Sequence, residues 1–526
     1  MAIENISVTG RSPESFSLQQ KAFLFIGFSG LFLALISVFN QLENNTLGWM
    51  LLSIALMSLG IIGYARELYK AKEPGIKNDN VFFKSLTNRG IWAYALGIFL
   101  TGFYVVLYFY PAYLGLNDNA ENTGLIAFFD PLSNWLSGNP ASQWFVYGVF
   151  YTLAVLLFGI KFLWKYKNNK YQRIRTFSVL FFQLGFAFLI PEFMARLNSD
   201  KFALPYYDLK NIWPLNYYNF EQYRVDEFIS AGGVGVALLV FGVLSILVIT
   251  PFLTYKYGKR WYCSWVCGCG GLAETAGDSF RHLSDKSIKS WKIERWMVHL
   301  VTVFVVIMTM AVVSSYLGYE SEKYWLSQPV FLVGSSVLLI LIYAWVLIYR
   351  KDSFNKDALL AGGGFLLAIL ILVGLHLLGW TQNLFFIEAE PLRSSYGFLI
   401  GSIFSGVIGT GFYPILGNRV WCRFGCPMAA ILGFQQRLFS KFRITTNGGQ
   451  CISCGNCSVY CEMGIDVRAY AQKGENIVRS SCVGCGICAS VCPRGVLKLE
   501  NESPKNRLNE NEILLGNDID LKQYTK

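Results

Sequence analysis

Long apolar runs alternate with short polar segments along most of the chain. A membrane-spanning helix needs about 20 mostly apolar residues. Ten runs meet this requirement, at residues 22–40, 46–64, 91–110, 144–163, 175–194, 229–252, 297–315, 329–348, 358–378 and 396–414. Pro191 and Pro414 lie near the ends of the fifth and tenth runs. The pattern predicts an all-α polytopic membrane protein with about ten transmembrane helices.

The polar pattern changes after the tenth run. Residues 441–500 mix apolar and polar positions as a soluble domain does, and residues 501–526 form a polar tail. We therefore expect an N-terminal membrane region at 1–226 and a membrane core at 227–440, each with about five helices. A small α+β domain is expected at 441–500.

Composition agrees with a membrane protein, because 53% of the residues are hydrophobic and only 15% are charged. A soluble domain has about 25% charged residues. The net charge of +11 comes from basic residues spread through short loops, which is a pattern of membrane topology and not of nucleic-acid binding.

Loop charge predicts the orientation. The loops after the second, fourth, sixth and eighth runs hold 23 Lys and Arg residues, and the facing loops hold six. Short cytoplasmic loops carry the excess of Lys and Arg. We therefore expect a multi-pass protein of the inner (cytoplasmic) membrane, with both termini and every cysteine on the cytoplasmic side.

All thirteen cysteines follow residue 262 and fall in tight local groups. Two groups are C-x2-C-x2-C-x3-C runs. The first run holds Cys451, Cys454, Cys457 and Cys461, and the second holds Cys482, Cys485, Cys488 and Cys492. In such paired runs, the fourth cysteine of each run binds the other cluster. We expect one [4Fe–4S] cluster on Cys451, Cys454, Cys457 and Cys492, and a second on Cys482, Cys485, Cys488 and Cys461.

Structural zinc and disulfides are the alternatives to clusters in this segment. Zinc sites usually close with two separate cysteine pairs, and disulfides are rare in a reducing compartment. Both are disfavoured, and the segment resembles the two-cluster bacterial ferredoxins. It departs from them at Glu462, where proline usually follows the last cysteine of a run. We expect Glu462 to alter backbone rigidity and potential more than cluster assembly.

Two further cysteine groups form a weak internal repeat. Cys263 and Cys267 follow the sixth apolar run, and Cys422 and Cys426 follow the tenth, each as a C-x3-C pair after a basic and aromatic segment. Packing of these two runs against each other would bring four thiols together near the cytoplasmic surface.

These motifs resemble the NosR and NapH family of membrane polyferredoxins, and more distantly the copper-oxidase maturation protein CcoG. The resemblance covers residues 229–500. It implies an electron-transfer oxidoreductase component that works between the quinone pool and a redox partner. The first pair departs from the family pattern, with Gly268 in place of proline and an additional Cys269.

Three interpretations of the C-x3-C pairs remain open: a third cluster, copper(I) or another soft metal, and a redox dithiol or structural thiols. The function that we expect is electron transfer between the quinone pool or a cytoplasmic donor and a redox partner. The alternatives are a copper-handling or maturation factor, and a transporter or scaffold. The aromatic segment 202–224, on the expected outer side, would either dock a partner or lie along the membrane.

Overall fold

The computed structural model describes residues 16–40, 42, 44–70, 87–117, 121–198, 203–319, 326–501, 514–515 and 519–520. Most of the expected polar tail 501–526 lies outside these residues, as do the basic loop residues Lys72, Lys77, Lys84, Lys201 and Lys323.

Long helices make up the membrane part of the fold. They are α1 (Leu18–Ile36), α2 (Thr46–Tyr69), α3 (Ile91–Phe109), α6 (Gln143–Lys165), α14 (Ile288–Tyr319), α15 (Gln328–Tyr349) and α16 (Lys356–Leu377), with two more that change winding along their length. One of these two joins α7 (Lys170–Phe181), η4 (Phe182–Leu189) and α8 (Ile190–Arg196), and the other joins α10 (Gly233–Leu244), η6 (Ser245–Ile249) and α11 (Thr250–Tyr257).

These nine are the helices, among the described residues, that are long and apolar enough to span a membrane, and they confirm the polytopic helical architecture. In two of them a π-helical segment comes shortly before a proline, Pro191 after η4 and Pro251 after η6. Proline has no N–H to donate to the preceding turn, so a wider local winding accommodates it.

The tenth expected span, 396–414, is not among the nine. The structure has α17 (Ala389–Tyr396) and the π-helical η9 (Gly397–Ile408), then a turn, then α18 (Tyr413–Leu416). Glu390 and Arg393 lie in the first turns, and Gly409 and Gly411 follow the end. The helical run that begins with α17 therefore ends at Ile408, and short helices follow it.

Short elements complete the chain. They are α4 (Gly124–Phe128), α5 (Asp130–Leu136), α9 (Gln222–Ser230), α12 (Arg260–Cys263), α13 (Gly268–Glu274), α19 (Val420–Phe424), α20 (Pro427–Phe439), α21 (Asn456–Val459), α22 (Val467–Lys473), α23 (Ile487–Ser490), the 3-10 segments η1 (Ser37–Phe39), η3 (Pro111–Leu114), η5 (Tyr217–Phe220), η7 (Ala276–Leu283), η8 (Lys351–Ser353) and η10 (Gly448–Gln450), and four strands. β1 (Arg443–Thr446) pairs antiparallel with β2 (Leu497–Glu500), and β3 (Leu514–Leu515) with β4 (Ile519–Asp520).

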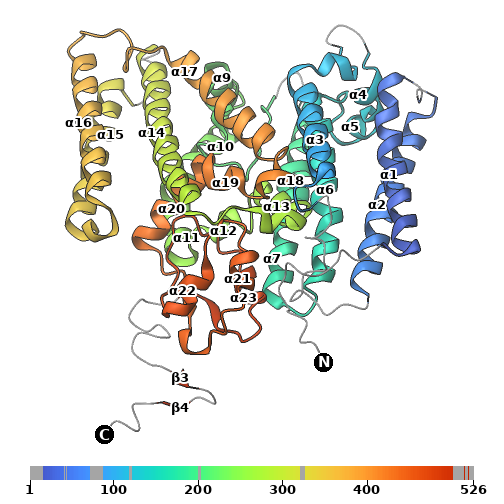
Figure 1. The fold of residues 1–526 in the computed structure, drawn as a ribbon. Coiled ribbons are helices and arrows are strands. Elements are labelled where there is room, and N and C mark those ends of the chain that lie inside the picture. Colours follow the sequence, from blue (N-terminus) through green and yellow to red (C-terminus); the bar gives the residue numbers. More distant parts are fainter. Residues whose placement is uncertain are drawn as a thin grey trace.

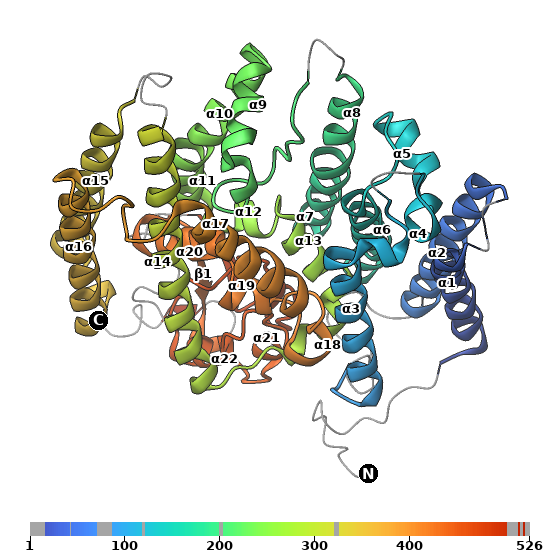
Figure 2. The same ribbon diagram turned by 90° about the horizontal axis from the view of Figure 1, so that it is seen from above.

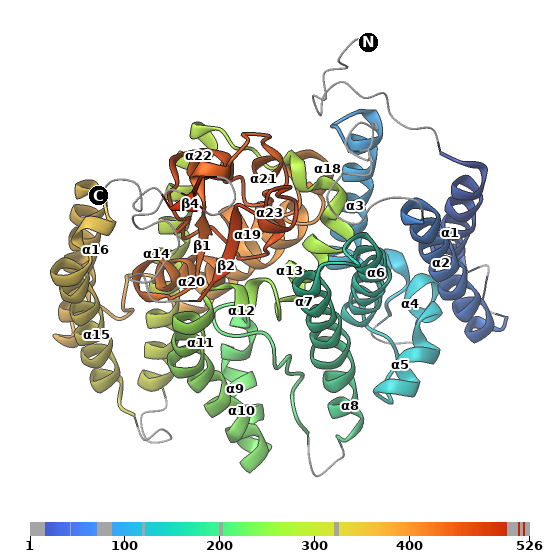
Figure 3. The same ribbon diagram turned by 90° about the horizontal axis from the view of Figure 1, so that it is seen from below.

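The C-terminal segment, residues 441–500, lies at one end of the long helices (Figure 1). Viewed from that end, it covers α12, α13, α19 and α20 (Figure 3). Viewed from the other end, α1 and α2 stand at one edge of the molecule and α15 and α16 at the opposite edge (Figure 2). We call the end with residues 441–500 the cysteine face and the other end the opposite face.

One hydrophobic core joins the membrane part to the C-terminal segment. Val305 and Met308 of α14 belong to the same buried cluster as Ile444, Val467 and Val496. The C-terminal segment therefore has no separate core, and its position relative to the helices is fixed by packing.

Candidate metal centres

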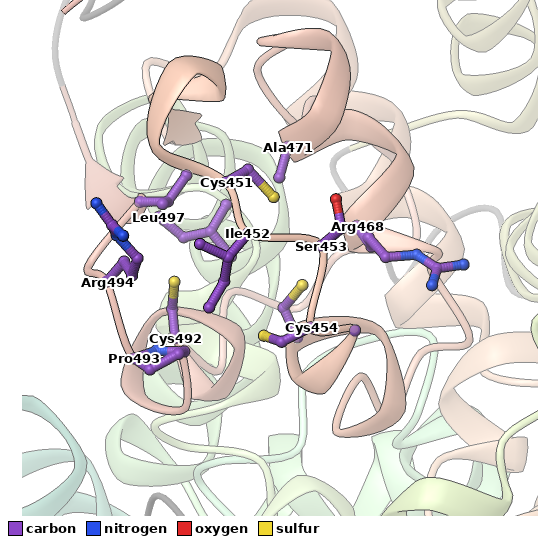
Figure 4. A pocket seen from close by; sticks show the side chains of 13 residues that line it. Cys451, Ile452, Ser453, Cys454, Arg468, Ala471, Cys492, Pro493, Arg494 and Leu497 are labelled. Carbon is purple, nitrogen blue, oxygen red and sulfur yellow. The ribbon is translucent and has the colours of Figure 1, made fainter. Parts of the chain in front are cut away.

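The first centre is a pocket in the C-terminal segment. Its lining includes Cys451, Cys454, Cys457 and Cys492, the four cysteines that spacing assigns to one cluster. The sulfurs of Cys451, Cys454 and Cys492 lie around one space, with Arg468 and Arg494 on its rim (Figure 4). Cys454 is exposed, so this centre lies closest to solvent.

The second pocket is lined by the other four cysteines of the runs, Cys461, Cys482, Cys485 and Cys488. The two pockets therefore match in their four thiols. Gly455 and Gly486 precede α21 and α23 with φ of 77° and 75°. These left-handed positions, which favour glycine, let each run turn back around its pocket.

The thiols of these pockets suit a cluster better than one ion. Among the described residues, no three His, Cys, Asp or Glu side chains lie close enough to hold a single metal ion. A tetrahedral zinc would need sulfurs about 3.8 Å apart, from its Zn–S distance of about 2.3 Å. A [4Fe–4S] cluster binds one thiolate at each of its four iron atoms, so its thiolate sulfurs lie farther apart than those around a single zinc ion.

Burial favours the protonated form of three free thiols of this segment, those of Cys457, Cys482 and Cys485. It raises the pKa of Cys457 and of Cys485 to about 12, and that of Cys482 to about 11, against the opposing effect of nearby backbone N–H groups. Binding of iron must therefore displace protons, and the same N–H groups remain to stabilise negative charge on the sulfurs.

A third centre lies among the membrane helices. We call it the membrane centre and define it as Cys263, Cys267, Cys269, Cys422 and Cys426, which share one core. Nη1 of Arg419 donates to the carbonyl of Cys263 at 3.1 Å and lies 3.6 Å from the Sγ of Cys422. The structure thus brings the two C-x3-C pairs together. Their backbones match: the N–H of Cys267 donates to the carbonyl of Tyr262 at 2.8 Å, and that of Cys426 to the carbonyl of Trp421 at 2.9 Å.

The membrane centre is deeper than the sequence suggests. Gln183 lies halfway along the 27-residue span Lys170–Arg196, about 20 Å from either end at about 1.5 Å per residue. A side chain at Gly268 would touch Gln183 at 2.7 Å, and one at Gly271 would touch Val179 at 2.5 Å. The chain after α11 therefore rises into the bundle as a hairpin and returns, with Cys267–Cys269 near its tip.

A buried charge network connects the membrane centre to the second pocket. Glu462 is fully buried and pairs with Arg281 at 2.7 Å and with Arg419 at 3.1 Å. Arg419 also pairs with Glu274 at 2.6 Å, and its Nη1 lies 3.6 Å from the Sγ of Cys422. Arg175 pairs with Glu274 in turn.

This network fixes the charge state of Glu462. Burial alone would raise the pKa of the Glu462 carboxyl, but Arg281, Arg419 and Arg175 outweigh that effect and lower it. Because Glu462 follows Cys461 directly, the arginines lie beside the second pocket as well as beside Cys422. Their positive charge suits neighbouring clusters whose thiolate ligands make them anionic.

Several residues of this site carried no signal in the sequence. Arg419 belongs to the repeated basic and aromatic segment, but its repeat counterpart Arg260 lies instead against Phe442 and Asn501. In the sequence pattern, Glu274 is a charged loop residue and Arg175 a charged residue at the end of a helix. Nothing in the pattern distinguishes them from other charged residues. The depth of the hairpins, which determines their burial, is invisible to a count of apolar residues.

Comparisons with known proteins support iron–sulfur binding at all three centres. The family model for a 4Fe-4S dicluster domain matches residues 450–497. The model for a 4Fe-4S binding domain matches twice, at residues 239–287 and 397–445, so each match contains one C-x3-C pair. Together these matches cover less than half of the chain.

Over 50 residues the chain is 40% identical to YccM of Escherichia coli (strain K12), a protein named for electron transport. The alignment covers 10% of this chain and 14% of YccM. No solved structure matches the chain. The protein is a multi-pass membrane protein with 4Fe-4S binding domains.

Proposed function

We propose that this protein passes electrons between the quinone pool or a cytoplasmic donor and a redox partner through three [4Fe–4S] clusters. Two clusters would bind the cysteine sets of the two pockets. The third would bind Cys263, Cys267, Cys422 and Cys426, with Cys269 beside them. When bound, the clusters supply one-electron carriers.

The observation that carries this proposal is the arrangement of the three centres. Cysteines of the first pocket, the second pocket and the membrane centre pack in one hydrophobic core. Arg419 contacts both Cys422 and Glu462, the neighbour of Cys461. Such an arrangement suits electron transfer from a solvent-facing site to a site among the membrane helices. Loop charge supports an inner-membrane location with the cysteine face in the cytoplasm.

The protein's own residues would hold the centres in place. Gln172 of α7 donates to the carbonyl of Cys485 at 2.9 Å, and Gln436 of α20 donates to that of Cys482 at 2.8 Å. Lys259, which is 1% exposed, donates to the carbonyl of Ser480 at 2.7 Å. These contacts fix the second pocket against the helices that carry the membrane centre.

Iron, acid-labile sulfide and copper per chain would test the proposal on anaerobically purified protein. Three four-iron clusters require about twelve irons and two require about eight. We expect about twelve in the wild type and about eight in a Cys263→Ser/Cys422→Ser variant. A Cys269→Ser variant is the matched control and should keep about twelve, since Cys269 lies outside the four proposed ligands.

Other outcomes would change the assignment. About eight irons in both proteins, with copper lost from the double variant, would favour copper handling as in a maturation factor. Little iron in the anaerobic wild type would contradict electron transfer through clusters altogether.

A further inference from the structure

A non-helical segment enters the bundle from the opposite face. Residues 203–216 connect α8 to η5, and much of the segment is buried, including Tyr207, Asp208 and Trp213. The indole N–H of Trp213 donates to the hydroxyl of Thr309 in α14 at 3.0 Å. Irregular backbone at membrane depth is tolerated only where protein buries it or where it lines a water-filled cavity. Residues 203–216 are therefore a re-entrant segment that the bundle largely buries.

Lys210 of this segment lies against the membrane centre. Its Nζ donates to Gln183 Oε1 at 2.9 Å and lies 4.0 Å from Asp208 Oδ2. The hydroxyl of Tyr262, next to Cys263, donates to the Lys210 carbonyl at 2.9 Å. A side chain at Gly268 would meet the Lys210 Nζ at 2.7 Å. Chain from the opposite face thus touches the cysteine hairpin inside the helix bundle.

The repeat is asymmetric at Gly268, where this contact lies. The second pair has Pro427 at the first position of α20, where proline fits well. At the equivalent position of the first pair, a proline ring would occupy the space of the Lys210 amine. Glycine leaves that space open. A buried ammonium is costly unless it is compensated, and thiolate-held negative charge at Cys267 would add to the compensation from Asp208.

We propose that electrons cross the membrane at this junction, from the membrane centre to a one-electron acceptor at the opposite face, along segment 203–216. This inference rests on the proposed function and adds a direction across the bilayer. The hydrocarbon core is about 30 Å thick, and segment 203–216 connects the cysteine hairpin to the opposite face through Lys210 and Tyr262. Lys210 is a positioning residue, whose positive charge stabilises the reduced form of the centre.

Proteoliposomes made from quinone-free lipids would test transmembrane transfer. Ferricyanide is trapped inside, and dithionite is added outside as the reductant. Molecules with the cysteine face outward should pass electrons inward, and each ferricyanide takes up one electron to become ferrocyanide. We expect reduction at least tenfold faster than with the Cys263→Ser/Cys422→Ser variant.

Two outcomes would overturn transmembrane transfer and leave the proposed function intact. In the first, dithionite reduces the clusters but the trapped ferricyanide is reduced no faster than with the double variant. In the second, ferricyanide is reduced only after menaquinone is added, because quinone itself would then be the carrier. Failure of the clusters to become reduced at all would instead contradict the proposed function.

A Lys210→Gln variant tests the contact between segment 203–216 and the membrane centre, through a potential as well as through the rate of transfer. We expect the iron content to stay near that of the wild type, the midpoint potential of the membrane centre to fall, and transfer to slow at least tenfold. The C-terminal centres should keep their potentials. Lys256→Gln, which removes an exposed lysine at the end of α11, is the matched control. An unchanged potential and rate in Lys210→Gln would overturn the role of Lys210.

Discussion

Glu462 replaces the proline that ferredoxins usually have after the last cysteine of a run. The sequence predicts a change in backbone rigidity, whereas the structure gives the side chain a defined role as a buried acceptor for Arg281 and Arg419. A proline could not pair with either guanidinium. The residue therefore links the C-terminal segment electrostatically to the hairpins of the membrane part.

Removing the Glu462 carboxylate should loosen this link. Loss of one partner from a buried ion pair costs about 3–5 kcal/mol, so Glu462→Gln should lower the thermal unfolding midpoint of the purified protein clearly. Glu462→Pro restores the usual ferredoxin residue and should be equally damaging. Glu475→Gln, an exposed carboxylate of the same segment, should change little. A stable Glu462→Pro protein would show that backbone rigidity is the main role of this position.

Helix α20 connects two of the centres. Cys426 is its N-cap residue, and Gln436 near its other end binds the carbonyl of Cys482. Gly433 lies between them, where a side chain would approach the Ser480 carbonyl oxygen to 2.7 Å. A backbone atom cannot move aside as a flexible side chain does, so the close packing of α20 against the second pocket depends on this glycine.

Gly433→Val should displace the loop that carries Cys482. Overpacking of this kind costs about 1–3 kcal/mol, and we expect a fall in iron content of up to four atoms per chain, the content of one cluster. Iron analysis and thermal unfolding would measure both effects. Gly334→Val in α15, where a side chain meets no atom within 4 Å, is the matched control. Full iron content and wild-type stability in Gly433→Val would contradict the packing argument.

Most of the elements could be predicted from the sequence, because a span of about 20 apolar residues has few alternatives to a helix. The eight cysteines of the two runs likewise fall into the two sets that their spacing indicates. The tenth span and the depth of the C-x3-C pairs could not be predicted. An apolar run that ends halfway across the bundle has the same composition as one that spans it, and only tertiary contacts such as Gly268 with Gln183 distinguish them.

At the scale of the whole molecule, the first pocket is where a centre meets solvent on the cysteine face among the described residues. Arg468 and Arg494 are exposed on the rim of the first pocket, beside the exposed Cys454. Complementary charge accelerates the encounter of redox partners and is screened by salt. We infer that an acidic one-electron carrier exchanges electrons here, because Cys454 is the one cysteine whose side chain is exposed.

An Arg468→Glu/Arg494→Glu variant should therefore slow electron exchange with a reduced acidic ferredoxin, used as the probe, by about tenfold or more at low ionic strength. Stopped-flow kinetics would measure this, and the difference should shrink as salt rises. Arg350→Glu/Lys351→Glu makes the same charge change on the loop after α15, on the same face, and should have a much smaller effect. Equal slowing in both variants would mean that net charge, and not the first pocket, guides the carrier. Unchanged rates in the first variant would place the entry of electrons elsewhere, with the membrane centre as the next site to test.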